Sequence, residues 1–400
     1  MKILFIIPST LRGGVEEYTL KISSAAVKEA WDAHVAFPKT EGTASLIQDF
    51  TAKGVCYHRL EIAETIDNNL LIIKKDLLHF IRTVLLLLKI KPDVVQIILP
   101  YPPYGLGSIL ACGLLQIPSA IRFGLVPFKW SFSLKKLKAY AWARARNQLW
   151  IAVSENNRKL ICESFQIPYE EVVCIKNGTK LMSDLIASNQ QKLNLLRYQI
   201  CQSLKISPNN QLILTVGRLD EQKGYQDLIP VIPHITKEFP NVKFIWVGEG
   251  QERDKLFNQL QEYGVEDKVL FLGYRSDIPK LLLSADFFLF PTRFEGHPNA
   301  LLEAMAHNLP IISSDASSIP EIIENNVHGL LFRTGDTCDL LETLRWALRH
   351  PEKMQEMAHN AKLRIQDFSE EKMVQETLGV LENLAQIKFP IIQSTVETNA

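Results

Sequence analysis

The chain has 400 residues, no formal net charge and 46% apolar residues. This length is too great for one ordinary core and predicts two domains. The balanced charge excludes the overall basic bias that is typical of nucleic-acid-binding proteins, although residues 1–185 carry 23 basic and 16 acidic residues and residues 186–400 carry 21 and 28.

The cysteines and the apolar segments predict where the protein resides. Six cysteines lie far apart, without a CxxC pair or a zinc-binding spacing, as is typical of free thiols in a reducing compartment. Residues 1–7 are better interpreted as a buried strand than as a signal peptide. The apolar run 84–88 is far shorter than the roughly 18 residues of a membrane span. We therefore expect a cytoplasmic protein, at most peripheral on the inner face of the membrane.

Short apolar runs alternate with longer helical patterns along the whole chain. The predicted strands are residues 2–7, 34–37, 94–99, 119–123, 149–153 and 172–175 in the first half and 212–216, 243–247, 269–272, 287–290, 310–313 and 329–332 in the second. Strands that are apolar on both faces are typical of parallel sheets covered by helices. Two successive β-α-β series predict an α/β protein with two doubly wound, Rossmann-like domains.

A turn signal at residues 176–179, followed by a polar stretch, predicts the domain boundary. We expect a first domain over residues 1–185 and a second over residues 186–370. A C-terminal helix within residues 371–389, with its pattern starting at residue 370, is expected to pack back across the junction. Residues 390–400 are expected to be an unstructured tail.

The loop after the first predicted strand contains the pair Gly13-Gly14. Without a Cβ, glycine lets the backbone approach a phosphate or a sugar closely. A plain tight turn is the alternative. The loop lacks the GxGxxG pattern, which counts against a dinucleotide-binding dehydrogenase.

The loop that follows the strand at residues 212–216 carries Arg218 and Lys223 between two glycines. Doubly wound sheets bind ligands at the carboxyl ends of their strands. Two cations on such a loop are suited to holding a diphosphate, and arginine supplies planar two-point contacts. The alternative is two surface charges, one of them balanced by Asp220 or Glu221.

The segment 291–306 joins a strand to a helix that is expected to begin at Pro298. Glu295 lies on the loop, and Glu303 lies eight residues further on, within the helix. The free N–H groups of the first helical turn can bind an anion. Two carboxylates beside an anion site suggest a ligand with hydroxyls and phosphates, such as a nucleotide-sugar. An ordinary strand-loop-helix unit with two solvated glutamates is the alternative.

Together, these three segments resemble the retaining glycosyltransferases of family 4, which have the GT-B fold. The resemblance extends over residues 1–385 and is strongest over residues 210–335. Further matching segments are residues 153–155, 247–250, 271–273 and 304–306.

The resemblance implies a role for each motif residue. Arg218 and Lys223 would hold the diphosphate of the donor. Glu303 would accept hydrogen bonds from the ribose, and Glu295 would face the transferred sugar. Further donor contacts are implied at Gly13 and Gly14, at His297, Pro298, Asn299 and Ala300, and at Tyr274 and Arg275 beside the base.

The resemblance also implies a hexosyltransferase without a cofactor, because the chain has no DxD metal motif. Cations and backbone amides would then stabilise the leaving nucleotide. The expected partners are a nucleotide-sugar donor and a glycan or lipid-linked acceptor in cell-envelope, lipopolysaccharide or exopolysaccharide synthesis, and no nucleic acid is expected. The alternatives are a GT-B epimerase or phosphorylase and a catalytically quiet homologue that binds a nucleotide-sugar as a subunit or regulator.

Two residues depart from the family pattern. Gly124 stands where many relatives have a histidine that contacts the donor sugar. Partial substitution by Arg122 is one interpretation, and weak activity or a different substrate is the alternative. His297-Pro298 replaces a common phenylalanine-glycine pair. His297 either contacts substrate or lies on a surface loop.

Residues 94–154 contain no acidic residue. We predict that basic side chains of this stretch contact anionic lipid headgroups or a phosphorylated acceptor. The residues assigned to this role are Arg122, Lys135, Lys136 and Lys138. At about 100° per residue the charges scatter around the predicted helix, so a solvated, partly buried helix is the alternative.

Overall fold

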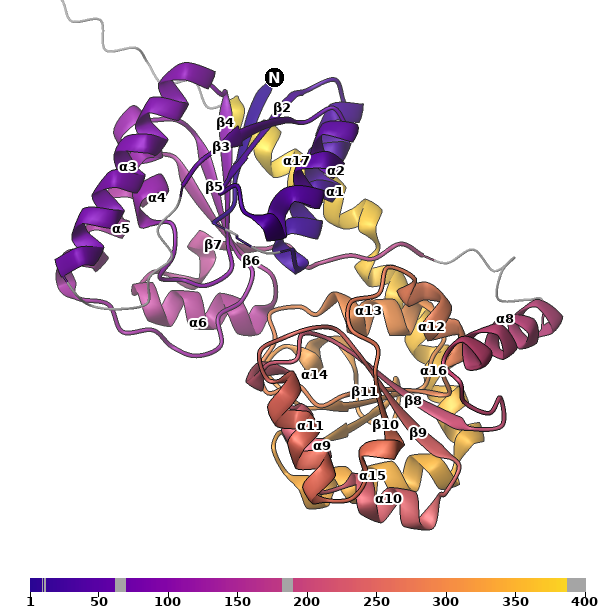
Figure 1. Ribbon diagram of the computed structural model, residues 1–400. Helices are drawn as coiled ribbons and strands as arrows, with labels where there is room; N and C mark the ends of the chain where they lie inside the picture. The colour runs from indigo at the N-terminus through magenta and orange to yellow at the C-terminus, as the bar shows by residue number, and fades with distance from the viewer. Residues whose placement is uncertain (9, 11, 62–69, 182–189, 387–400) are drawn as a thin grey trace, which may run out of the picture.

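The computed structural model describes residues 1–8, 10, 12–61, 70–181 and 190–386. The chain forms two lobes joined by two crossing segments (Figure 1). The predicted boundary between residues 185 and 186 and the predicted tail 390–400 lie outside the described residues.

The first lobe is built on a seven-stranded parallel sheet with the order β3-β2-β1-β4-β5-β6-β7. Its strands are β1 (Lys2–Ile6), β2 (Asp32–Phe37), β3 (Cys56–Arg59), β4 (Val94–Leu99), β5 (Ser119–Phe123), β6 (Gln148–Ala152) and β7 (Val172–Cys174). Its helices are α1 (Gly14–Lys28), α2 (Ala44–Ala52), α3 (Leu70–Ile90), α4 (Leu106–Leu115), α5 (Leu134–Arg144) and α6 (Glu155–Phe165).

The second lobe has a six-stranded parallel sheet with the order β10-β9-β8-β11-β12-β13. Its strands are β8 (Gln211–Val216), β9 (Val242–Val247), β10 (Val269–Phe271), β11 (Phe287–Phe290), β12 (Ile311–Ser314) and β13 (Leu330–Phe332). Its helices are α8 (Gln190–Ser203), α9 (Tyr225–Leu228), α10 (Ile232–Glu238), α11 (Arg253–Glu262), α12 (Ile278–Ser284), α13 (Asn299–Ala306), α14 (Ile319–Ile322), α15 (Thr337–Arg349) and α16 (Pro351–Arg364).

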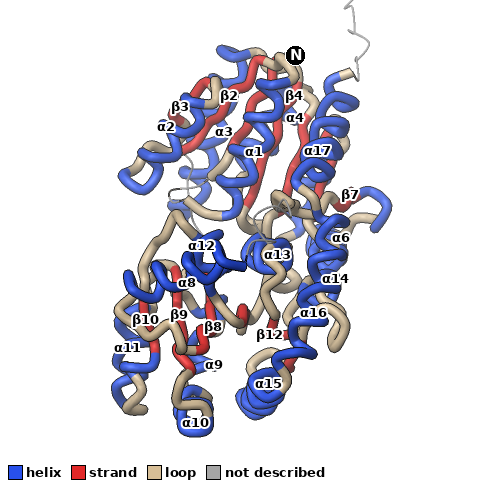
Figure 2. Tube along the Cα trace, turned by 90° about the vertical axis from the view of Figure 1, so that its right-hand side faces the viewer, coloured by secondary structure: helices blue, strands red, loops and turns tan. Residues whose placement is uncertain are grey.

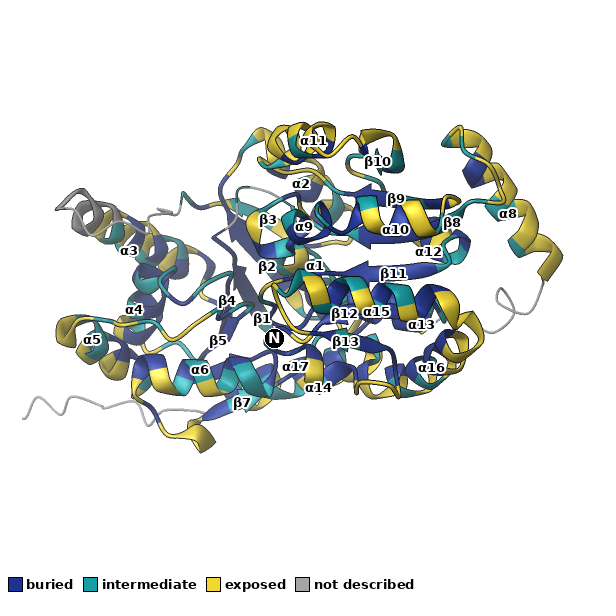
Figure 3. Cartoon of the chain, turned by 90° about the horizontal axis from the view of Figure 1, so that it is seen from below, coloured by how far each residue is buried: buried dark blue, intermediate teal, exposed yellow. Residues whose placement is uncertain are grey.

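The two sheets confirm the predicted fold class of two doubly wound domains. Strands such as β4 and β11 are buried along their whole length because helices cover both faces of each sheet (Figure 3). The sequence prediction missed β3, whose residues are only partly buried at the edge of the first sheet. This strand is defined by its parallel pairing with β2, from His34 opposite Cys56 onward.

The last helix, α17 (Glu370–Ala385), leaves the second lobe and packs on α1, β4 and β5 of the first lobe (Figure 2). Its residues Met373 and Leu381 share a core cluster with Phe5 of β1. The crossing segments are hydrogen-bonded to each other: Thr179 N donates to Phe368 O at 3.0 Å, and Glu370 N donates to Thr179 O at 2.9 Å. The chain therefore crosses between the lobes twice at one place, where the two crossing segments form a parallel bridge between Thr179 and Ser369.

The six cysteines are unpaired in the structure. Among the helices of the described residues, none combines the length and the apolar content needed to cross a bilayer.

Candidate functional site

The strand order places the candidate site at one edge of the second sheet. In this sheet the winding direction reverses between β8 and β11, which are adjacent and parallel. Loops that follow the two strands at such a reversal diverge and leave a ligand-binding crevice. The loop after β8 carries Arg218 and Lys223, and the loop after β11 carries Glu295. The topology therefore brings together residues that are more than 70 positions apart.

Gly224 fixes the shape of the loop after β8. The side chain of Asp220 accepts a hydrogen bond from Lys223 N and caps a short 3-10 turn. Gly224 then adopts a left-handed conformation with φ of +70°, and a Cβ there would lie 2.0 Å from Pro291 O of the loop after β11. Only glycine fits this approach, so the two loops are locked against each other.

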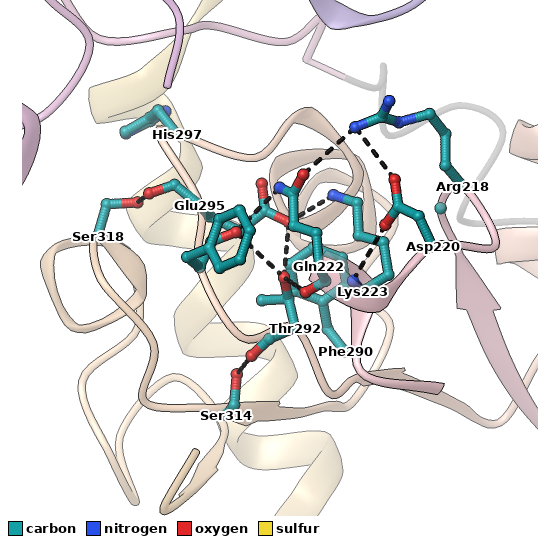
Figure 4. Close-up of polar contacts among 12 residues, drawn as sticks. Arg218, Asp220, Gln222, Lys223, Phe290, Thr292, Glu295, His297, Ser314 and Ser318 are labelled. Carbon is teal, nitrogen blue, oxygen red and sulfur yellow. Dashed lines mark hydrogen bonds and ion pairs between the residues drawn. The ribbon is translucent and has the colours of Figure 1, made fainter. Parts of the chain in front are cut away.

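Glu295 is the centre of the cluster and is only 6% exposed. Its Oε1 accepts hydrogen bonds from Lys223 Nζ and, at 2.9 Å, from Thr292 Oγ1 (Figure 4). The Lys223 ammonium also lies 5.2 Å from the ring centroid of Phe290. A buried ion pair is maintained when further hydrogen bonds satisfy its charges, as they do here. The solvated-glutamate alternative is therefore wrong for Glu295.

Arg218 differs from Lys223 in its exposure. Its side chain is 60% exposed, with NH2 3.2 Å from Asp220 Oδ2 and 3.3 Å from Gln222 Oε1. Exposed ion pairs of this length contribute little to stability, so the guanidinium can exchange these contacts for an anionic ligand at low cost. The site thus combines an ordered buried cation with an accessible one.

Glu303 faces the first lobe. The helix α13 begins at Asn299 rather than at the expected Pro298, because Pro298 has an extended backbone with ψ of 119°. Burial raises the pKa of the Glu303 carboxyl; the charge of Lys21 on α1 opposes this shift and that of Glu17 reinforces it. The Glu303 carboxyl group therefore lies within electrostatic reach of α1 of the first lobe.

Glycines of the first lobe approach the same region. A Cβ on Gly14 would lie 3.8 Å from Asn299 Nδ2 of α13, and a Cβ on Gly296 would lie 2.0 Å from Gly124 O. A Cβ on Gly124 would lie 3.1 Å from Val15 Cγ2. A side chain at position 124 would thus begin against the Val15 side chain and, at 3.3 Å, the Leu99 carbonyl oxygen.

Arg122 does not have the surface role that was predicted for it. Its side chain is 1% exposed and lies 3.9 Å over the ring of Tyr18. NH1 donates to Ile175 O at 3.0 Å, and NH2 donates to Asn177 Oδ1 at 2.6 Å. Its contacts are internal, so the prediction of a membrane or acceptor contact is wrong for Arg122. Lys135 and Lys138 of α5 are exposed and Lys136 is half-buried, and their predicted role stays a prediction.

His297 is buried, and the prediction of a surface-loop histidine is wrong. The residue is 3% exposed, and its ring centroid lies 5.3 Å from that of Phe368. Burial lowers the pKa of His297 to about 3, and neither ring nitrogen has a hydrogen-bond partner among the described residues. Its carbonyl accepts from Asn177 Nδ2 at 2.7 Å. The ring points away from the Glu295 cluster (Figure 4), so its backbone and not its imidazole connects the lobes.

Tyr274 and Arg275 follow β10 at the same edge of the second sheet. Tyr274 is exposed, which leaves its ring free to lie against a flat ligand group. Arg275 makes a two-point ion pair with Asp277 through Nε at 2.8 Å and NH2 at 2.7 Å. Their contact with a base stays a prediction.

Three contributors were missed by sequence reasoning. Thr292 precedes Glu295 by three residues, and a hydroxyl at the end of a strand was a usable signal. Asn177 bridges Arg122 to the His297 carbonyl. Glu321 of α14 accepts from Glu155 N at 2.9 Å and caps α6 of the other lobe. The last two act across the lobes, and no local pattern marks them.

Two further observations concern possible metal sites and a cavity among the described residues. No group of three or more histidine, cysteine, aspartate or glutamate side chains in the described ranges could hold a metal ion. A cavity of about 370 Å³ lies beside the crossing segments, away from Glu295, with Lys176, Asn177, Phe368 and Lys372 among its lining residues. Its charges are of mixed sign, because Glu155, Asp367 and Glu376 also line it.

Comparisons with known proteins agree with this architecture. The model described as glycosyl transferases group 1 matches residues 198–364, and the model described as glycosyltransferase family 4 matches residues 12–181. A glycosyltransferase of Methanocaldococcus jannaschii, MJ1607, described as uncharacterized, is 34% identical over 183 residues, which cover 45% of each chain. In this relative and in two further curated relatives, the matched region spans about half of the relative's length.

A longer match is to an Escherichia coli protein, UDP-Gal:alpha-D-GlcNAc-diphosphoundecaprenol alpha-1,3-galactosyltransferase. It is 24% identical over 356 residues, covering 86% of this chain and 87% of that protein. The crystal structure of Anabaena Alr3699/HepE in complex with UDP-glucose superposes with a TM-score of 0.75 at 22% identity, covering 96% of this chain and 100% of that chain. The chain therefore belongs to the group 1, family 4 glycosyltransferases and has the GT-B fold, as its motifs predicted.

Proposed function

We propose that this protein is a retaining glycosyltransferase that moves a hexose from a nucleotide-sugar to a glycan acceptor. The observation that carries the proposal is the buried Glu295–Lys223 pair with the accessible Arg218 beside it, at the strand reversal of the second sheet. This arrangement offers two cations to a diphosphate and one carboxylate to sugar hydroxyls.

The donor would lie between the lobes. Arg218 and Lys223 bind the diphosphate, and the first-turn amides of α13, at Asn299 and Ala300, add partial positive charge. Glu303 accepts hydrogen bonds from the ribose. The loop of Gly13 and Gly14, which faces Asn299, closes over the donor from the first lobe.

Catalysis would proceed at the front face of the sugar. The bond between the anomeric carbon and the leaving phosphate oxygen breaks, and a bond to the acceptor hydroxyl oxygen forms on the same face. The acceptor proton passes to the leaving phosphate. Glu295 binds a sugar hydroxyl and steadies positive charge at the anomeric carbon, while Arg218 and Lys223 stabilise the departing diphosphate in place of a metal ion.

The acceptor is proposed to be lipid-linked, in the synthesis of a cell-envelope or exported glycan. The name of the Escherichia coli relative, which specifies a diphosphoundecaprenol-linked acceptor, supports this class. The basic excess of residues 1–185 supports an acceptor that carries phosphate. Such a reaction would place the protein on the cytoplasmic side of a membrane.

The test uses the purified full-length chain. A thermal-shift screen over nucleotide-sugars identifies the donor, and NMR of the transfer product gives its anomeric configuration. Glu295→Ala should lower turnover about 10²- to 10³-fold with the fold intact. Glu262→Ala, which removes an exposed carboxylate from α11 of the same lobe, should leave turnover unchanged. Near-normal turnover of Glu295→Ala, or an inverted product, contradicts the mechanism.

Gly124 favours a second candidate, a nucleotide-sugar-binding subunit or regulator without turnover. The family histidine is missing there, and the backbone of Gly296 closes on the Gly124 carbonyl. Donor binding without hydrolysis or transfer to any acceptor would support this candidate. Turnover with any acceptor would exclude it.

A further inference from the structure

The helix α3 has an exposed apolar face whose position the donor site does not explain. Its exposed large side chains are Leu77, Leu78, Ile81, Leu85 and Leu88, which are 44–62% exposed. At about 100° per residue these five positions fall within roughly one third of the helix circumference. We call them the α3 stripe. The opposite side of α3 is ordinary core: Leu87 and Ile90 are buried, and His79 Nε2 is 2.9 Å from Ser108 Oγ of α4.

Basic side chains border the α3 stripe. Arg82 and Lys89 are exposed and lie along one margin of the same helical face. Between residues 77 and 154 the sequence has a single carboxylate, Asp93, and its Oδ2 accepts from Lys2 N beside β1. The flank that α3 shares with α4 and α5 is thus basic in composition, with the half-buried Asp76 as the acidic residue of α3.

Helix α5 extends this surface. Helix α4 packs against both α3 and α5. Burial raises the pKa of Asp76 on α3, and the charge of Lys136 on α5 opposes that shift, so these two residues lie within electrostatic reach of each other. Lys135 and Lys138 of α5 are exposed, and so are the large apolar side chains of Phe128 and Leu134.

The orientation of these helices places the surface beside the cleft. Each of α3, α4 and α5 follows a strand of a parallel sheet, so each begins at the carboxyl edge of the first sheet, the edge toward the second lobe (Figure 1). Figure 3 shows the three helices along one flank of the molecule, with α8 of the second lobe at the opposite end.

We propose that the α3 stripe and the lysines of α5 form a docking surface for an anionic lipid bilayer. Exposed leucine and isoleucine side chains on one helical face enter the region between headgroups and acyl chains, and basic residues at its margin attract anionic headgroups. The charge pattern favours an anionic occupant and disfavours a second copy paired through the same face, because that copy would bring its own lysines and arginines against the same basic surface. Among anionic occupants, the row of exposed leucine and isoleucine side chains favours a bilayer, whose acyl chains can take them up. Bilayer docking does not depend on the donor reaction. Its use, which rests on the proposed function, is to hold the cleft near the headgroups where a lipid-linked acceptor is anchored.

The experiment is co-sedimentation of the full-length chain with vesicles of phosphatidylcholine alone or mixed with phosphatidylglycerol. The wild-type chain should bind the anionic vesicles and bind the neutral ones at least about tenfold more weakly. Leu85→Glu should reduce binding about tenfold or more. Its matched control is Leu195→Glu on α8, where the leucine is equally exposed (57% against 62%), and this control should bind normally. The triple replacement of Lys135, Lys136 and Lys138 by glutamine should weaken binding on the order of 100-fold.

Three results would overturn the proposal. The wild-type chain does not sediment with anionic vesicles, or Leu85→Glu and Leu195→Glu bind them equally, or light scattering shows a dimer that Leu85→Glu dissociates. Calorimetric donor binding without vesicles, measured on the same variants, separates this proposal from the donor reaction. If the chain binds vesicles but no nucleotide-sugar, only the proposed function is contradicted. If the chain turns over donor but does not bind vesicles, only the docking surface is contradicted.

Discussion

The two lobes have the same strand order around the central reversal, yet their facing edges differ in chemistry. The edge of the second sheet holds the ion pair of Glu295 and Lys223, with Arg218 accessible beside it. The corresponding edge of the first sheet presents backbone at Gly14 and Gly124. One sheet topology thus supports two different edges: the second lobe supplies charged side chains, and the first supplies a close approach of backbone.

The largest expected effect on donor binding comes from removing a cation at the second lobe. Lys223→Ala should weaken donor binding about 10- to 100-fold, because a charged hydrogen-bond partner of the diphosphate is lost. Calorimetry with the donor measures the effect. Lys237→Ala, which removes an exposed lysine from α10, is the control and should bind normally. Equal donor affinities for the two variants would show that Lys223 does not bind the diphosphate.

The close approach of the lobes can be broken by one methyl group. Gly296→Ala places a Cβ 2.0 Å from Gly124 O, so the lobes must separate or distort. We expect a loss of about 1–3 kcal/mol in the free energy of unfolding, together with reduced turnover. Gly379→Ala in α17, where the new Cβ meets nothing within 4 Å, should be neutral or stabilising by up to about 1 kcal/mol. Denaturant unfolding compares them, and equal stabilities would show that the approach is not tight.

The buried imidazole at the junction predicts a pH effect on stability. The pKa of His297 is lowered from 6.5 to about 3, so the unfolded chain binds the proton more readily and the folded state loses stability as the pH falls through this window. His297→Phe keeps the contact with Phe368 and removes the titrating group. Its melting temperature should therefore fall less on acidification than that of the wild-type chain. Parallel melting curves for both would contradict the burial of a neutral ring.

A smaller pH effect is expected on donor binding. Because burial raises the pKa of Glu303, this carboxyl takes up a proton at a higher pH than a solvated glutamate and then accepts fewer hydrogen bonds from a ribose. Donor affinity should fall a few-fold on mild acidification. Glu303→Gln should bind more weakly at neutral pH but lose this dependence, and calorimetry at two pH values decides. An unchanged slope in the variant would exclude Glu303 as the titrating group.

The sequence predicted most of the fold because buried parallel strands are recorded locally as apolar runs. The predicted bounds of β4, β5 and β11 match the structure. The edge strand β3 was not predicted, because its residues are exposed or only partly buried. The cluster of Arg218, Lys223 and Glu295 could be anticipated, because loops after adjacent strands of a doubly wound sheet meet at a fixed place.

Arg122 and His297 were misjudged for the opposite reason. Their burial depends on contacts with residues 53 and 120 positions away, which no local pattern records. A basic residue within an apolar strand, such as Arg122, is better interpreted as an internal connector when every neighbouring strand position is buried.

The position of α17 sets the order in which the protein can be completed during synthesis. Met373 and Leu381 of α17 share a core cluster with Phe5 of β1, so the core of the first lobe includes residues that are made after the whole second lobe. The ribosome must deliver the second lobe before α17 can pack on the first, so the apolar surface under α17 stays exposed in the interval. A nascent chain arrested after Phe368 should be cut by protease within residues 1–181 far faster than one released after Gln386.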